Sequence, residues 1–137
     1  MNYGILYQIK TVVDEFGADV NDRMHNQLST LHCAAQSYCG YLSILVLVKD
    51  YKVSPNITDN FNATPLHFAI INKQFMNVEL LIALGADVNA QDFQGHTPLH
   101  LTVIRLSQDV GNFALYKRIM KELCFYGADR SIKTKQD

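Results

Sequence analysis

Thr64-Pro65-Leu66-His67 recurs as Thr97-Pro98-Leu99-His100, 33 residues further along the chain. A weaker copy, Ser29-Thr30-Leu31-His32, lies 35 residues before the first of these segments. A hydroxyl residue suits the N-cap of a helix and proline suits its first turn, so each copy predicts the start of a helix. Recurrence at a period of a few tens of residues is typical of repeat architectures.

A second motif has the same period. Gly85-Ala86-Asp87-Val88-Asn89 is echoed by Gly17-Ala18-Asp19-Val20-Asn21 and by Gly127-Ala128-Asp129, and Lys52-Val53-Ser54-Pro55-Asn56 shares its phase. Glycine commonly ends a helix in the left-handed conformation, so the motif predicts the end of a second helix in each unit. Before Gly85, helical spacing predicts an apolar face formed by Phe75, Val78, Leu81 and Ile82.

A period near 33 residues with these two motifs resembles the ankyrin repeat, and the resemblance covers nearly the whole chain. It implies an all-α fold, an ankyrin-repeat solenoid of paired antiparallel helices with β-hairpin fingers between units. We expect one ankyrin-repeat domain over residues 1–137, with about three full repeats after a partial N-terminal repeat. The expected units are roughly 1–23 (partial), 24–58, 59–91 and 92–133.

Departures from the pattern locate the irregular parts of the array. Lys52 replaces the helix-ending glycine, which costs about 1–2 kcal/mol if the backbone is left-handed there. Asn62 stands where Gly95 stands one unit later, and asparagine tolerates that backbone better than most residues. The last unit holds nine extra residues, which we place in a loop between its helices near 106–113. The first unit begins with an outer helix at 5–16, with no inner helix before it.

The composition describes a chain that can bury a core. Apolar residues make up 48% of the 137 residues, and the net charge is −1. This balance argues against nucleic-acid binding driven by phosphate neutralisation and against long disorder. The longest apolar run, 44–48, is too short to span a bilayer, so we expect no membrane insertion. Three cysteines without Cys-x-x-Cys spacing (Cys33, Cys39, Cys124) favour reduced thiols in a cytoplasmic or nuclear protein.

The in-phase histidines His32, His67 and His100 do not predict a metal site. Equivalent positions in neighbouring units are about 8–10 Å apart, whereas zinc needs each ligand nitrogen at about 2.0–2.1 Å. We expect these histidines to form hydrogen bonds near the finger and the cap residue. Cys33 follows His32 directly, so the two side chains diverge on a helix. We therefore expect no catalytic, cofactor or metal site, and no enzyme activity.

Ankyrin arrays usually bind proteins through their fingertips and the exposed side of their inner helices, and the resemblance implies the same role for matching positions here. The candidate partner-binding residues on the fingers are His25, Asn26, Leu28, Asn60, Phe61, Phe93, Gln94 and His96. Those on the inner helices are Ile71, Asn72, Ile104 and Arg105. We expect His25 and His96 to be exposed. Phe61 and Phe93 share one finger position, so they are either binding anchors or rings folded onto neighbouring fingers.

These features favour a non-catalytic protein–protein interaction module whose concave finger and inner-helix face binds a protein partner. We expect the isolated chain to be a monomer. The alternative is the recognition segment of a larger enzyme, such as a palmitoyltransferase or a ubiquitin ligase, whose catalytic domain lies outside these residues. The partial first unit slightly favours a segment of a larger protein over a small protein with short caps.

Overall fold

The computed structural model describes residues 8–137, so the first residues of the helix expected at 5–16 lie outside it. Residues 8–10 are helical and lead into the π-helical segment η1 (Thr11–Glu15). Two 3-10 turns, η2 and η3, occupy His25–Gln27 and Val110–Asn112. Three helix pairs make up the rest, namely α2 (Thr30–Gln36) with α3 (Tyr41–Lys49), α4 (Pro65–Ile71) with α5 (Phe75–Ala83), and α6 (Pro98–Gln108) with α7 (Phe113–Phe125).

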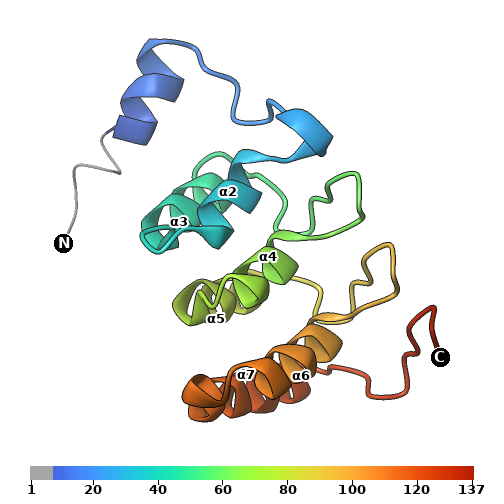
Figure 1. Cartoon of the computed structure of the whole chain (residues 1–137). Coiled ribbons are helices and arrows are strands. Elements are labelled where there is room, and N and C mark those ends of the chain that lie inside the picture. The colour runs from blue at the N-terminus through green and yellow to red at the C-terminus, as the bar shows by residue number, and fades with distance from the viewer. Residues whose placement is uncertain (1–7) are drawn as a thin grey trace.

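The helix pairs stack in order along the chain, as the sequence predicts. The inner helices α2, α4 and α6 pack in one row, and the outer helices α3, α5 and α7 pack in a second row. Buried side chains from all three pairs form one continuous hydrophobic cluster. The fingers project from one side of this stack (Figure 1). No unit could cover its apolar faces alone, so the fold depends on the contacts between units.

The expected β-hairpin fingers are tight turns. Across residues 8–137 the structure contains no strand, and the only strand-like pairing there is an isolated bridge between Arg23 and Ser29. Each later finger closes with a single antiparallel bond, in which the Asp59 N–H donates to Ala63 O at 3.1 Å and the Asp92 N–H to His96 O at 3.0 Å. The fingers are too short for a longer ladder to form.

Each inner helix begins with a hydroxyl residue paired to a histidine three positions later. The hydroxyl-to-Nδ1 distances are 2.7 Å for Ser29 and His32, 2.8 Å for Thr64 and His67, and 2.8 Å for Thr97 and His100. In all three pairs the backbone N–H of the hydroxyl residue donates to the same ring nitrogen. Because an N–H can only donate, Nδ1 is unprotonated and the proton of the neutral ring is on Nε2.

The same rings join consecutive units. His32 Nε2 donates to Ala63 O at 2.9 Å, and His67 Nε2 donates to His96 O at 3.0 Å. Both acceptors lie at the end of the next finger. Both rings are fully buried, and burial lowers the pKa of His32 and of His67. The expected bonds to the cap and the finger are confirmed for His32 and His67, and for His100 the bond to the cap is confirmed.

Asparagines form a second link between units. Asn56 Nδ2 donates to Gly85 O at 3.2 Å, and Asn56 Oδ1 accepts from the Asp87 N–H at 2.6 Å. Asn89 makes the same two bonds to the unit that follows it. Asn56 therefore joins the loop after α3 to the loop after α5, and Asn89 joins the loop after α5 to the loop after α7.

A buried amide that the sequence analysis missed holds the turn between α2 and α3. Asn77 on α5 is 2% exposed, and its Nδ2 lies 3.0 Å from Ala35 O and 2.8 Å from Ser37 O. The turn also requires glycine at position 40, because a Cβ there would lie 1.7 Å from Ala34 O. The signal was a polar residue within the apolar outer helix of the third unit.

The extra residues of the last unit lengthen its two helices. The expectation that they form a loop near 106–113 is therefore wrong. The inner helix α6 has 11 residues where α4 has 7, and the outer helix α7 has 13 where α5 has 9. Four residues are about one helical turn, so each helix gains one turn and keeps its face toward the core. The salt bridge from Lys73 Nζ to Asp109 Oδ2, at 2.8 Å, ties the extension to the preceding unit.

We predict that the chain loses stability when acid protonates the bridging histidines. A buried ring with a lowered pKa binds fewer protons than in the unfolded chain, so its contribution is complete above about pH 6.5 and is lost as the pH falls through its folded-state pKa. Urea unfolding from about pH 8 to about pH 5 should show this decline. His67→Gln should lower stability at high pH and flatten the slope, while His25→Gln on the exposed first finger should leave the slope unchanged. Equal slopes in all three proteins would contradict the assignment.

We also predict that Lys52→Gly stabilises the chain by about 0.5–1 kcal/mol. Lys52 has a φ of 58°, in the position where Gly85 has a φ of 94°. The reverse change, Gly85→Lys, is the matched control, because a Cβ at Gly85 meets no atom within 4 Å and only backbone strain opposes it. Urea titrations of both variants should shift in opposite directions. A destabilised Lys52→Gly protein would contradict the prediction.

Candidate protein-binding surface

Two aspartates fix the second and third fingers. Asp59 Oδ1 accepts from the N–H groups of Phe61 and Ala63, both at 2.9 Å. Asp92 Oδ1 accepts from Gln94 and His96 in the same way, also at 2.9 Å. An aspartate that accepts hydrogen bonds from the backbone of its own turn stabilises a finger too short to make such contacts with other segments. The tips are therefore held in one conformation before any partner arrives.

Backbone hydrogen bonds also connect one fingertip to the next. The Asn60 N–H donates to Asn26 O at 2.9 Å, and the Phe93 N–H donates to Phe61 O at 2.8 Å. The Lys135 N–H continues the series to Gln94 O at 2.9 Å. This close approach explains Gly95, because a Cβ there would lie 3.0 Å from the Lys135 nitrogen. The fingertips thus form one ridge rather than independent loops.

The first finger is built differently because it lacks the aspartate. Asn26 and Gln27 both have left-handed backbones, with φ of 60° and 59°. Here the turn is held by Arg23 instead, whose Nη1 donates to Gln27 O at 2.8 Å. The same nitrogen also donates to Thr58 O at 3.2 Å. Arg23 is therefore a structural residue of the finger ridge, a role that the sequence analysis did not assign.

The structure brings Phe61 and Phe93 together at the centre of this ridge. Their ring centroids are 5.7 Å apart with the planes tilted by 55°. Phe61 remains 48% exposed and Phe93 52% exposed. The interpretation that the rings fold onto neighbouring fingers is confirmed by this contact, and the binding role stays a prediction, for which the rings keep apolar surface exposed. A half-exposed aromatic pair on a rigid ridge has the chemistry of a binding anchor.

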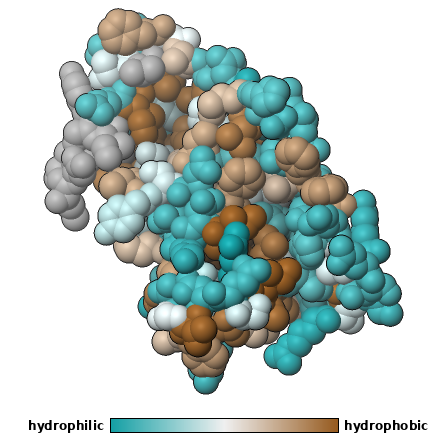
Figure 2. All heavy atoms as spheres, in the orientation of Figure 1, coloured by the Kyte–Doolittle hydropathy of each residue, from teal (hydrophilic) through white to brown (hydrophobic). Residues whose placement is uncertain are grey.

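The other candidate residues divide by exposure. His25, Asn26, Asn60, Asn72 and Gln94 are exposed, as are Ile71 and Ile104, whereas Leu28 and Arg105 are half-buried. His96, expected to be exposed, keeps only 17% of its side chain exposed, because Nδ1 lies 3.5 Å from Asp92 Oδ2. Figure 2 shows hydrophobic residues interrupted by hydrophilic ones on the side that carries the fingers.

Ile71 and the phenylalanine pair do not form one continuous strip. Ile71 ends α4, while Phe61 precedes the start of that helix. Seven helical residues span about 10 Å, so the apolar positions stand at opposite ends of the inner helices. Ile104 is different, because α6 is longer, and it lines a shared hollow of about 330 Å³ with His96 and His100. Finger and inner helix thus meet most closely in the last unit.

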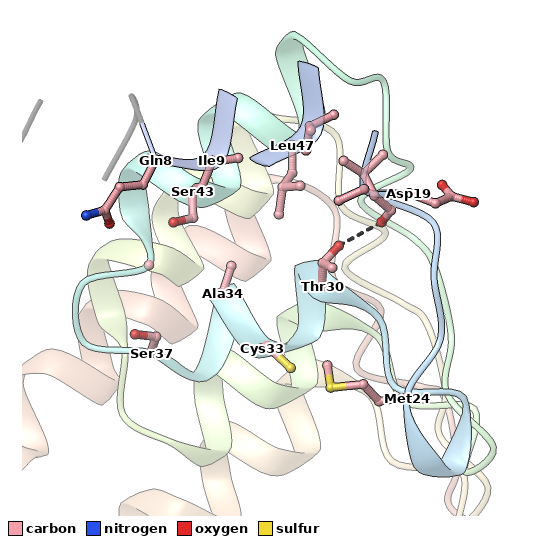
Figure 3. Close-up of a pocket in the computed structure, with 14 residues that line it drawn as sticks. Gln8, Ile9, Asp19, Met24, Thr30, Cys33, Ala34, Ser37, Ser43 and Leu47 are labelled. Carbon is pink, nitrogen blue, oxygen red and sulfur yellow. Dashed lines mark hydrogen bonds between the residues drawn. The ribbon is translucent and has the colours of Figure 1, made fainter. Parts of the chain in front are cut away.

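A larger groove that the sequence analysis did not predict lies at the other end of the stack. It has a volume of about 530 Å³ and separates the 8–20 segment from α2 and α3. Figure 3 shows Thr30 and Cys33 on α2 and Ser37 just after the end of that helix, all on the floor of the groove. The opposite wall is formed by Ile9, Val13 and other apolar side chains. The groove was not predicted, because it depends on how the 8–20 segment packs against α2 and α3.

The groove is lined by one cysteine and one acidic residue, Cys33 and Asp19. Burial raises the pKa of the Cys33 thiol, so little of it is thiolate at neutral pH. The Thr30 hydroxyl donates to Val20 O at 2.9 Å and closes one end of the floor. The carboxylate of Asp19 accepts from the Asn21 N–H at 2.8 Å and is exposed.

Across residues 8–137, no group of three or more His, Cys, Asp or Glu side chains is arranged to bind a metal ion. No helix within that range is both long and apolar enough to cross a membrane.

Comparison with known proteins identifies the family. Residues 46–101, from the middle of α3 to the start of α6, match the family described as "Ankyrin repeats (many copies)". Residues 46–101 are ankyrin repeats. The matched residues include the second and third fingers, with Phe61 and Phe93, and the bridging pair His67 and His96. Ankyrin repeats are in general protein-interaction modules.

Relatives share parts of this ankyrin array. Ankyrin repeat domain-containing protein 53 of Macaca fascicularis is 43% identical over 81 residues, which are 55% of this chain and 16% of that protein. NF-kappa-B inhibitor alpha of Gallus gallus is 44% identical over 46 residues, which are 34% of this chain and 14% of that protein. The putative palmitoyltransferase ZDHHC13 of Danio rerio is 28% identical over 95 residues, which are 69% of this chain and 14% of that protein. The chain spans only a small part of each of these relatives.

We predict that the Phe61–Phe93 contact contributes to the stability of the ankyrin stack. A double-mutant cycle with Phe61→Ala and Phe93→Ala should give a coupling of about 0.5–1.5 kcal/mol in the free energy of unfolding. Urea unfolding of the four proteins measures it. Additive effects of the two substitutions would show that the rings do not pack on each other in solution.

Proposed function

We propose that this chain is a non-catalytic module that binds a protein partner through the concave face formed by its finger ridge and inner helices. One observation carries the proposal. The Phe61–Phe93 pair stands half-exposed on fingertips that Asp59 and Asp92 already hold in place. A rigid aromatic anchor binds at a small entropic cost, because little conformational freedom is left to lose.

The amide side chains beside the pair suit a protein ligand. Asn60 and Gln94 are exposed next to the phenylalanines in the two fingers, where they can donate to and accept from a peptide backbone. Ile104, Arg105 and the hollow beside His96 extend this surface along α6. An apolar centre with a polar rim is the usual composition of a protein–protein interface. The proposal includes a cytoplasmic or nuclear location, in keeping with three free thiols.

A second candidate function is recognition within a larger enzyme. The similarity to a putative palmitoyltransferase over 95 residues supports it, because the matched part is only 14% of that relative. In this case the ankyrin chain selects the substrate protein and a separate domain performs the chemistry. The length of the parent gene distinguishes the two functions, since the second requires coding sequence for a catalytic domain.

The test is affinity capture from a lysate of the source cells, followed by calorimetric titration of the protein that is retained. Phe61→Ala with Phe93→Ala should weaken binding by about 2 kcal/mol or more, which is about a thirtyfold increase in Kd. The pair leaves the core untouched, so circular dichroism should show an intact helical stack.

The matched control is Phe125→Ala, because Phe125 is 84% exposed but lies on the outer helix α7 rather than on a finger. This variant should bind as the parent chain does. Equal losses for the finger and α7 variants, or full binding by the finger variant, would refute the assignment of the surface.

A further inference from the structure

Two lysines in the last turn (residues 129–137) stand at positions that are exposed in the preceding finger. Lys133 follows Gln91 by 42 residues, which is the offset between the last two copies of the glycine motif. Lys135 follows Phe93 by the same offset. Gln91 and Phe93 are exposed although another turn packs beside them, and both lysines are exposed as well. The exposure of the lysines therefore reflects their position in the unit, and they extend the finger ridge beyond Phe93.

Hydrogen bonds fix these lysines beside the third finger. The Lys135 N–H donates to Gln94 O at 2.9 Å. Lys133 O accepts from the side-chain amide of Gln91 at 3.1 Å. These bonds use only main-chain atoms of the two lysines, so they set the position of each residue without engaging its ammonium group.

The carboxylates of the finger ridge are bound within their own turns. Asp59 and Asp92 each accept from two N–H groups of their own finger. Asp137 accepts from the N–H and the hydroxyl of Thr134, both at 3.0 Å. These bonds lower the pKa of Asp137, and the nearby charge of Lys133 lowers it further. Asp137 therefore offsets part of the charge of Lys133, but no ridge carboxylate is left without a donor from its own turn.

The inner helices add positive charge to the concave face and no negative charge. The helices α2, α4 and α6 contain no aspartate or glutamate, and Arg105 is their only arginine or lysine. Arg105 Nη1 lies 3.4 Å from the neutral amide oxygen of Gln108. Across residues 8–137, none of the ion pairs includes Arg105, Lys133 or Lys135. A partner that brings carboxylates to this face supplies the counter-charges that the chain itself does not.

We propose that the concave face binds an extended acidic segment of a partner protein. An apolar side chain of the segment packs on the Phe61–Phe93 pair, and its aspartate or glutamate side chains reach the two lysines of the last turn. This inference rests on the proposed function and adds the chemistry of the partner. Lysine is a point charge without the planar fork of arginine, so aspartate and glutamate serve equally.

The spacing of the segment follows from the stack. Neighbouring units are about 8–10 Å apart, and an extended chain advances about 3.3 Å per residue. One finger therefore corresponds to about three residues of the segment. The acidic residues should stand about three to six residues from the apolar one, on one side of it only.

The probe is a phage-displayed library of random peptides of about twelve residues, which span about 40 Å when extended. Selection on the folded chain in about 0.1 M salt should enrich peptides with the predicted spacing of apolar and acidic residues. Fluorescence anisotropy of a labelled enriched peptide then gives its Kd. Lys133→Glu with Lys135→Glu should raise this Kd about tenfold, and selection on that variant should no longer enrich acidic peptides.

Two controls separate charge from folding. The bonds that hold Lys133 and Lys135 use main-chain atoms, so the variant should keep the urea midpoint of the parent chain. Replacing the acids of the peptide by the matching amides should weaken its binding to the parent chain by a similar factor, with no change in the protein. Lys117→Glu with Lys121→Glu is the matched variant, because it makes the same change of net charge on the exposed side of α7. It should change the Kd by less than about twofold.

The selection also distinguishes this inference from the proposed function. Enriched peptides without acids that still require Phe61 and Phe93 would overturn the inference and leave the finger surface in place. Acidic peptides that bind a Phe61→Ala, Phe93→Ala chain unchanged would refute the finger surface itself. The inference also fails if no peptide is enriched, if the α7 variant loses as much affinity as the finger variant, or if the amide peptide binds as tightly as the acidic one. A single-stranded oligonucleotide that binds more tightly than any enriched peptide would assign the lysines to nucleic acid instead.

Discussion

The neutral histidine at the start of each inner helix is the interaction on which the array depends. Its Nδ1 accepts from the cap residue of its own unit, and for His32 and His67 the Nε2 proton is donated to the finger of the next unit. One ring thus pairs the backbone N–H of the cap residue in its own unit and, in His32 and His67, also joins that unit to the next finger. A protonated ring could not make both contacts, because Nδ1 would then be a donor.

The proposed binding surface follows from these links between units. Since each finger is fixed to the ring of the preceding unit, neighbouring fingertips approach closely enough for the Phe93 N–H to reach Phe61 O. The two phenylalanines then meet because they share one position in consecutive fingers. The aspartates complete the arrangement by closing each turn on itself. A partner therefore meets a surface whose shape is set by contacts deep in the stack.

The regular part of the fold could be predicted because its causes are local. Proline and a hydroxyl residue start the inner helices, and the left-handed position after each outer helix appears at Gly85 and even at Lys52. The irregular parts depend on longer-range packing. Loop-forming residues such as Ser107 and Gln108 lie exposed within α6, where the Ser107 hydroxyl donates to Ile104 O and Lys73 of the preceding unit pairs with Asp109.

The candidate site was predictable to a similar extent. Repeat phase placed Phe61 and Phe93 on neighbouring fingertips, but only coordinates show that the rings touch. His96 was misjudged because its aspartate partner lies four residues before it, across the turn. Asn77 and Arg23 were missed because their acceptors are backbone carbonyls from other segments, which a sequence does not display. The groove depends on how the 8–20 segment packs against α2 and α3.

The proton assignment of the bridging rings has a chemical consequence. In His32 and His67 the one free lone pair of the ring, on Nδ1, already accepts hydrogen bonds, and Nε2 carries its proton into a carbonyl. No nucleophilic nitrogen is left for an electrophile such as diethyl pyrocarbonate while the units stay stacked. The rate at which these two rings become carbethoxylated is therefore a clock for the transient separation of one repeat from the next.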